Sequence, residues 1–428
     1  AIKDYLDTSR AKAIRDPLWK HIYFTSDLYE LIGSEAFHSL SRIKQLGPAY
    51  MVYPGATHTR FSHSLGVYHI ASRILRLLLH ADQAIRISLQ GAKAFLCASL
   101  LHDLGHFPYA HSLKELPLID HEILTARMIL EAPLRDIIRD RIGTDPEMVA
   151  SIVSADEVAL ESEEIELFRN ILSGVLDPDK LDYLNRDAYY CGVPYGLQDI
   201  DYALSRILLY RNRGIAIDQS GITVVENILF SKYLMYKAVY WHRAVRTATA
   251  MIKKAVYLGL EEAVVRPDEL YLLDDDSFFT LLNEKSFKPF RLVEEVSKRR
   301  FYKTLYDTSF KPEDEGHRSL ESLAERRKRE QRILDEISRL CGKAFEEYEI
   351  LIDIPEDISF EIQLPVKSAD VFISYPESDT VFTPKVIGDF TKTLRRLRIM
   401  AAPRIEEELK RKGINSAEIL SAEGLFLQ

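Results

Sequence analysis

The chain has 428 residues, 46% of them hydrophobic and 28% charged, which is typical of a globular protein with a large core and excludes a mainly disordered chain. Its formal net charge of −9 disfavours long nucleic acids as partners, because a negative surface repels a polyanion, but it leaves small nucleotides open. Three widely separated cysteines, Cys97, Cys191 and Cys341, argue against a disulfide framework and a thiolate metal site.

The N-terminal segment, residues 1–17, alternates charged with small residues and lacks the apolar stretch of a secretory signal. No segment has the roughly 18 uncharged apolar residues that cross a bilayer. The most apolar run, residues 92–101, is typical of a buried helix. We therefore expect a cytoplasmic protein without a membrane span.

Eight of the twelve histidines lie within residues 58–121, so we expect the chemistry in this part of the chain. Apolar residues at helical spacing follow Ser62 and Ser64, either of which can cap a helix. This pattern predicts a helix over about residues 63–80.

A second helix, apolar almost all round, is predicted over residues 92–103 and ends at the Leu-Gly-His-Phe-Pro sequence that follows. Adjacent side chains in mid-helix diverge by roughly 100°, so His102 and Asp103 can point into one cavity only because the regular winding stops there. Imidazole nitrogen and carboxylate oxygen suit a borderline or hard divalent cation, and other helices must supply the remaining ligands. His63 and Asp179 are the candidates. A His-Asp pair alone is weak evidence, because such pairs arise by chance.

From about residue 121 to 250 the pattern stays helical and predicts one continuous bundle, with an aromatic helix from Leu229 to His242. The charge run at 311–340 is typical of a solvated helix face, with a subunit contact as the alternative. Three short β-rich runs stopped by prolines then precede a helical tail from about Pro384; they are residues 348–355, 359–366 and 369–376.

These patterns predict a mainly α protein, a helical bundle with a small C-terminal α+β appendage. Three parts are expected: a helical core with an N-terminal segment (1–250), a helical extension (251–345) and a small α+β region (346–428). We find no internal repeat in the sequence.

The order of a histidine, an adjacent His-Asp pair at the end of an apolar helix and a distant aspartate resembles the HD-domain family. Within that superfamily, the chain is most similar to deoxynucleoside triphosphate triphosphohydrolases. Four segments carry this resemblance: RIKQLGPAYMVYPGATHTRFSHSLGV (42–67), LLHDLGHFPYAH (100–111), DHE (120–122) and LDPDKLDYLNRD (176–187). It extends more loosely from about Asp16 to Trp241, and it implies an HD-domain helical bundle.

The resemblance assigns coordination of a divalent metal ion (manganese, iron, magnesium or similar) to four residues, His63, His102, Asp103 and Asp179. It also places three histidines, His106, His111 and His121, around a reacting α-phosphate. There an imidazole can donate to a phosphate oxygen, orient water or protonate a leaving group, so one of them should be the general acid.

The resemblance further assigns substrate contacts. Phosphate anchoring falls to Arg60, Lys180, Tyr183 and Lys232, for which surface pairing is the plain alternative. The deoxyribose falls to Gln45 and Asp187, which would hydrogen-bond the 3′-hydroxyl, to Leu46, which would line the pocket, and to Tyr240. Tyr240 would occupy the place of a 2′-hydroxyl and so select deoxyribose, although a tyrosine on an aromatic helix is often plain core.

Two departures from the family pattern change the expected regulation. Where a regulated animal relative binds an activating guanine nucleotide, this chain has Gly33, His38 and Ser41, so we expect either no activation or a different nucleotide activator. Three residues after the position of His111, that relative has a carboxylate, whereas this chain has Lys114. We expect Glu115 to orient His111 instead.

The sequence leaves the reaction and the assembly open. One alternative is an HD phosphodiesterase or phosphohydrolase acting on another nucleotide, and a second is a non-catalytic metal-binding regulatory protein. Family resemblance implies a homodimer or homotetramer. The deoxynucleoside triphosphate (dNTP) remains the expected substrate.

Overall fold

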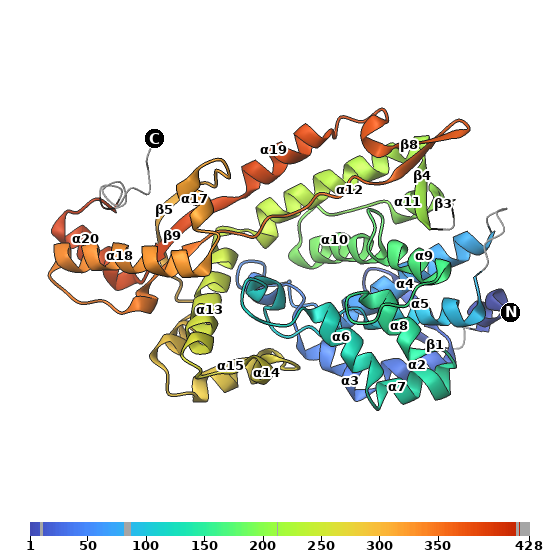
Figure 1. The fold of residues 1–428 in the computed structure, drawn as a ribbon, viewed down its shortest axis with the longest axis horizontal. Coiled ribbons are helices and arrows are strands. Elements are labelled where there is room, and N and C mark those ends of the chain that lie inside the picture. Colours follow the sequence, from blue (N-terminus) through green and yellow to red (C-terminus); the bar gives the residue numbers. More distant parts are fainter. Residues whose placement is uncertain (9–11, 81–86, 212, 417–418, 420–428) are drawn as a thin grey trace.

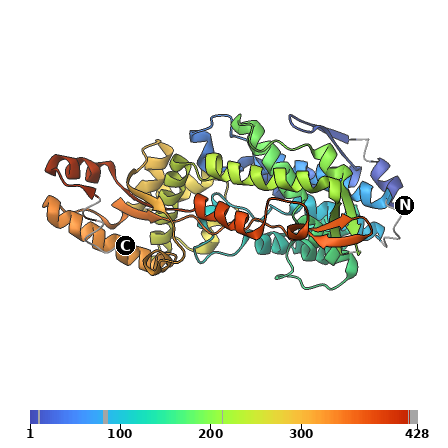
Figure 2. The same ribbon diagram turned by 90° about the horizontal axis from the view of Figure 1, so that it is seen from above.

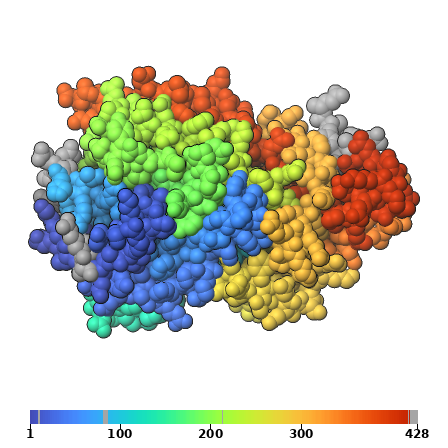
Figure 3. Space-filling view, turned by 180° about the vertical axis from the view of Figure 1, so that it is seen from behind, coloured from blue at the N-terminus to red at the C-terminus, as the bar shows by residue number. Residues whose placement is uncertain are grey.

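The computed structural model describes residues 1–8, 12–80, 87–211, 213–416 and 419. It shows an elongated molecule with a large helical body and a smaller lobe (Figures 1 and 2). The chain runs from the body into the lobe and returns to the body at residues 365–374 (Figure 1). It then crosses to the lobe again along α19 (Pro384–Leu394). Seen from behind, the orange-red C-terminal segments cover one side of the green part of the body (Figure 3). The expected mainly α fold with a C-terminal α+β region is confirmed.

Helices dominate the body. Its elements are α1 (Ile2–Asp7), β1 (Lys12–Asp16), β2 (Lys20–Phe24), α2 (Ser26–Ile32), α3 (Glu35–Ser39), α4 (Arg60–His80), α5 (Leu89–Leu101), the 3-10 turn η4 (Ala110–Leu113), α6 (His121–Leu130), α7 (Leu134–Asp136), the π-helical turn η5 (Ile137–Ile142), α8 (Pro146–Val153), α9 (Glu163–Leu172), α10 (Pro178–Cys191), α11 (Ile200–Ser205), β3 (Ile207–Tyr210), β4 (Gly214–Asp218), α12 (Ile222–Met235) and the π-helical turn η7 (Tyr236–Tyr240). The two helices predicted in the histidine-rich part are confirmed as α4 and α5. Within the described ranges, the helices are too short or too polar to cross a membrane.

The lobe and the returning segments complete the fold. They comprise α13 (Arg243–Glu261), α14 (Pro267–Leu270), α15 (Asp275–Glu284), α16 (Arg291–Ser297), β5 (Lys303–Ser309), α17 (Glu315–Ser319), α18 (Leu323–Cys341), β6 (Ile350–Asp353), β7 (Pro365–Ser368), β8 (Val371–Ser374), α19, β9 (Arg396–Ala401) and α20 (Pro403–Lys412). The helical tail predicted from about Pro384 is interrupted, because β9 lies between α19 and α20.

Strands from the last third of the chain enter two different sheets. One sheet has the order β3-β4-β7-β8, with β4 and β7 parallel, and lies on the body. The other has the order β5-β9-β6 and is antiparallel. Because β3 and β4 interrupt the helices after residue 121, the expectation of one continuous bundle up to residue 250 is wrong. Short apolar runs such as these do not distinguish a strand from a buried helix by periodicity.

The largest core lies around α5, which is buried on every side. Phe95 of α5 stacks on Phe168 of α9, with ring centroids 4.7 Å apart. Phe360, Leu364 and Val366 join the same core from the segment that returns to the body. The last third of the chain therefore helps to close the body.

The charge run on α18 is only partly a solvated face. Arg326 and Glu330 are buried, with exposed fractions of 3% and 4%. Glu330 Oε2 lies 2.5 Å from Lys254 Nζ of α13, and its other oxygen accepts a hydrogen bond from the Ile352 amide at 2.6 Å. The expectation of a solvated face is wrong at these two positions, because burial of a charged side chain requires such partners.

We expect Glu330→Ala to lower the free energy of unfolding by about 3–5 kcal/mol, because it leaves the buried Lys254 ammonium without its partner. The matched control is Lys328→Ala on the same helix, which removes an exposed pair with Glu325 and should cost about 1 kcal/mol or less. Urea denaturation measures both, and equal losses would contradict the buried pair.

Candidate active site

The metal ligand predicted on α4 lies in the first turn of that helix and is buried. His63 Nε2 is 2.9 Å from Asp179 Oδ1 and 3.8 Å from Asp103 Oδ2. On the other side of the ring, Nδ1 donates to Asp182 Oδ2 at 2.8 Å. Burial opposes the charged imidazole, but the hydrogen bonds to Asp179 and Asp182 raise the pKa of His63 to about 10.

His102 ends α5, and its ring orientation is fixed by the helix itself. Its Nδ1 donates to the Ser99 carbonyl at 3.0 Å, so Nε2 carries the lone pair. That nitrogen is buried and has no hydrogen-bond partner among the described residues. It lies 3.4 Å from Asp103 Oδ1 and 3.9 Å from Asp179 Oδ1. A buried, unpartnered acceptor facing two carboxylates fits a divalent cation.

The structure brings all four sequence-predicted metal ligands together. Donor atoms of His63, His102 and Asp103 lie within 4.8 Å of one another, and Asp179 meets them from α10. Imidazole and carboxylate donors together admit several divalent metals, as expected. Burial alone would raise the pKa of Asp103, but its electrostatic interactions with His106 and Arg60 hold this pKa well below its usual value, so this carboxylate is ionised.

A second set of side chains, which the sequence analysis missed, positions His63. Asp182 receives Arg186 Nε at 2.8 Å and Trp19 Nε1 at 2.5 Å, in addition to His63. Arg186 in turn pairs with Asp16 of β1 at 2.8 Å. The signal was present in the sequence, because Asp182 and Arg186 share one face of α10 with Asp179 at helical spacing.

Gly66 has to be small for this arrangement. A Cβ at this position would lie 1.8 Å from Asp182 Oδ1 and 2.6 Å from Arg186 Nη2. The glycine of α4 therefore allows the carboxylate that holds His63 to approach the helix.

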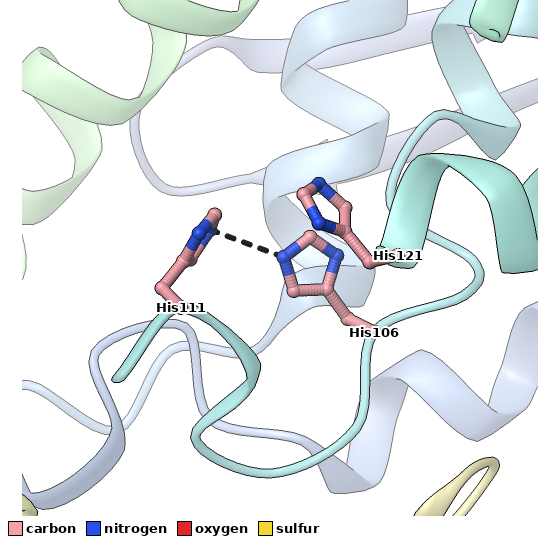
Figure 4. Close-up of side chains that lie close together, drawn as sticks. All are labelled: His106, His111 and His121. Atoms are coloured by element: carbon pink, nitrogen blue, oxygen red, sulfur yellow. Dashed lines mark hydrogen bonds between the residues drawn. The ribbon is translucent and has the colours of Figure 1, made fainter. Parts of the chain in front are cut away.

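The three predicted catalytic histidines converge beside this centre (Figure 4). His106 Nε2 is 3.1 Å from His111 Nε2, and the ring centroids of His106 and His121 are 3.8 Å apart. Burial lowers the pKa of His121 to about 4, and burial and the Arg60 charge hold the pKa of His106 well below its usual value.

Glu115 does not orient His111, contrary to expectation. Its carboxylate lies against Lys253 of α13 and Arg326 of α18, with Arg326 Nη2 at 2.6 Å from Oε1. These partners are 138 and 211 residues away in the chain, so local helical spacing could not reveal them.

Two of the predicted sugar contacts, Asp187 of α10 and Tyr240 of η7, form a second cluster. Asp187 accepts from Tyr240 Oη at 2.7 Å and faces His58 Nε2 at 2.8 Å, a histidine for which the sequence suggested no role. Gln45 Oε1 is buried without a hydrogen-bond partner in the described structure. Leu46 is partly buried against the same body core.

The predicted phosphate contacts lie on three helices, and all three cations among them already have partners. Arg60 Nη1 donates to Asp103 Oδ2 at 2.6 Å, whereas its buried Nε has no partner among the described residues. Lys180 Nζ lies 2.7 Å from Glu361 Oε2, and Lys232 Nζ donates to the Ser359 carbonyl at 2.7 Å. Burial raises the pKa of Tyr183 well above its usual value, so its hydroxyl is neutral.

Two family patterns match most of the chain, and one of them includes His63, His102 and Asp103. The sequence pattern of a family described as "HD domain" matches residues 60–176, and that of "HD associated region" matches residues 200–377. A solved structure of a hypothetical protein from Aquifex aeolicus is 30% identical, with a TM-score of 0.71, and the match covers 94% of this chain and 99% of that one.

Two relatives show how far the sequence likeness extends. An uncharacterised protein of Methanocaldococcus jannaschii is 34% identical over 302 residues, which are 70% of this chain and 60% of that protein. The chain thus spans less than two thirds of this relative's length. A Dictyostelium discoideum protein named deoxynucleoside triphosphate triphosphohydrolase SAMHD1 homolog is 25% identical over 402 residues, covering 89% of this chain and 74% of that one.

We expect Asp182→Asn to weaken divalent metal binding by about 10–100-fold, because the carboxylate behind a ligating imidazole fixes its orientation and basicity. Asp201→Asn is the matched control, since Asp201 is exposed on α11 and pairs only with Arg73 among the described residues. Competition with a chelator measures the affinity, and melting curves check the fold. Unchanged affinity in a folded Asp182→Asn protein would contradict the positioning role.

The depressed pKa of His121 predicts acid sensitivity. Because its folded pKa of about 4 lies below the ordinary value of 6.5, the neutral ring contributes stability above pH 6.5 that is lost as the pH falls towards 4. In His121→Gln, the loss of unfolding free energy between pH 6.5 and 5 should be smaller by about 1–2 kcal/mol. Denaturation at each pH tests this, with the exposed His38→Gln as the control; parallel pH profiles would refute it.

Proposed function

The chain belongs to the HD domain family, and on this premise we propose that it is a metal-dependent phosphohydrolase that converts dNTPs to deoxynucleoside and tripolyphosphate. One observation carries the proposal: the unpartnered Nε2 of His102 faces two carboxylates and His63, directly beside three more imidazoles. A cluster of ligands next to a cluster of proton-carrying groups suits phosphoester hydrolysis.

Residues around the centre provide for the charge of the substrate. When bound, the divalent cation supplies polarisation of the phosphate and activation of water. Arg60, whose buried Nε has no partner among the described residues, can donate to a phosphate oxygen beside Asp103. Lys180 is held by Asp177, Glu361 and the Gly174 carbonyl, and Lys232 by the Ser359 carbonyl; both offer ammonium groups to a phosphate that displaces these partners.

The reaction requires a proton at the leaving group. Water adds to the α-phosphorus, the bond from phosphorus to the 5′-oxygen breaks, and that oxygen takes up a proton. His121 and His106 are neutral in the free protein because their pKa values are low. A bound triphosphate places negative charge beside these rings and raises their pKa values. Substrate binding therefore favours the protonated imidazole that serves as the general acid.

The sugar end of the site accounts for selection of deoxyribose. Tyr240 and His58 hold the two carboxylate oxygens of Asp187, which fixes this acceptor for a 3′-hydroxyl. Gln45 Oε1 offers a second buried acceptor. Family resemblance assigns to Tyr240 the place of a 2′-hydroxyl, so ribonucleotides should fit less well.

The proposal is tested by incubating the purified chain with four dNTPs and four NTPs in the presence of manganese, iron or magnesium. We expect tripolyphosphate and deoxynucleoside from dNTPs, slower turnover of NTPs, and a loss of about 10²–10⁴-fold in His121→Gln. Exposed His38→Gln is the control and should keep full activity. Release of pyrophosphate or orthophosphate would indicate another phosphohydrolase, and no turnover with any metal would contradict enzymatic function.

A further inference from the structure

The imidazoles of His106, His111 and His121, here called the histidine trio, come from three separate turns of the chain (Figure 4). His106 follows the end of α5, His111 lies in η4, and His121 begins α6. One nitrogen from each ring lies within 4.8 Å of the others. The distance between His106 Nε2 and His111 Nε2 is 3.1 Å.

Two carboxylates stand behind the trio. His106 Nδ1 is 3.3 Å from Asp103 Oδ1, and His121 Nδ1 is 3.3 Å from Asp120 Oδ1. Neither contact fixes a tautomer, since the buried His106 Nδ1 has no hydrogen-bond partner among the described residues. The two carboxylates place negative charge beside the rings, and this charge favours a bound cation.

We propose that the histidine trio is a second metal site, for a borderline transition metal such as Zn²⁺, separate from the centre formed by His63, His102, Asp103 and Asp179. Tetrahedral ligands about 2.0–2.1 Å from zinc lie roughly 3.3 Å from one another, close to the 3.1 Å between His106 and His111. Three imidazoles without a carboxylate select zinc, nickel or copper over magnesium or calcium. The fourth ligand position stays open to water.

The surrounding charges permit a second cation. Two cations oppose it, the Arg60 guanidinium, which donates to Asp103, and the Lys114 ammonium, 3.5 Å from Asp120 Oδ2; the carboxylates of Asp103 and Asp120 offset this repulsion. Asp103 also stands between the two centres, since its Oδ1 lies 3.4 Å from His102 Nε2 and 3.3 Å from His106 Nδ1. His111 is exposed, so a metal ion can reach the trio from solvent.

Occupancy of the trio has a consequence for turnover, and this part rests on the proposed function. A metal bound by the trio takes the lone pairs that would otherwise accept and deliver protons at the leaving group. Zinc therefore inhibits the enzyme at a site distinct from the one that activates it.

Cobalt binding to the metal-stripped protein tests the site directly, because tetrahedral Co²⁺ held by imidazoles has a distinctive visible absorption. We expect the wild type to bind two equivalents and His111→Gln to lose the tetrahedral signal, with affinity for one equivalent weakened at least about 10-fold. Asp179→Asn should keep that signal and lose affinity for the other equivalent. His38→Gln, exposed and remote from these ligands in sequence, should bind two.

Melting curves check that each variant is folded, and His121→Gln serves as a second probe of the trio. One equivalent in the wild type, or an unchanged tetrahedral signal in both His111→Gln and His121→Gln, would overturn the proposal. In the turnover arm, we expect added Zn²⁺ to inhibit a manganese-loaded wild-type enzyme. If cobalt binds to the trio but no metal supports dNTP turnover, the proposed function is contradicted and the proposed second metal site is supported.

Discussion

The hydrogen bond from His63 to Asp182 is the interaction on which the geometry of the candidate metal centre depends. It holds the imidazole of α4 so that Nε2 faces Asp179 and Asp103. Asp182 is in turn fixed by Arg186 and Trp19, and Arg186 by Asp16 of the N-terminal hairpin. A ligand is thus placed by a chain of charges that begins in the first sixteen residues, far from the cation itself.

Burial explains why so many of these groups occur in pairs. A charged side chain removed from water needs a partner. Such pairs occur both around the candidate metal centre and along α13. Lys253 and Lys254 of that helix meet Glu115 and Glu330 from opposite parts of the chain. The loop that carries His111 is therefore tied to the lobe by the ion pairs of Glu115, and the lobe becomes part of the framework of the site.

Features that depend on residues close together in the sequence could be predicted from it. The helices α4 and α5 and the winding that stops at His102 follow from local periodicity. The four candidate metal ligands came from resemblance to the HD-domain family, and the structure brings them together. Strand pairing was not accessible in this way, because β4 meets β7 across roughly 150 residues and short apolar runs look alike in helices and strands. The role expected of Glu115 failed for the same reason, since its cationic partners come from distant segments.

The contacts of Glu361 and Ser359 connect the candidate site to the segment that comes from the lobe. Both residues belong to the segment that leaves β6 of the lobe and rejoins the body at β7, and they engage Lys180 and Lys232. An anion that recruits these ammonium groups has to compete with the segment for them. By thermodynamic reciprocity, whatever loosens the segment favours the anion to the same degree that the anion loosens the segment. Ligand affinity and the position of the lobe are therefore coupled through the segment between β6 and β7.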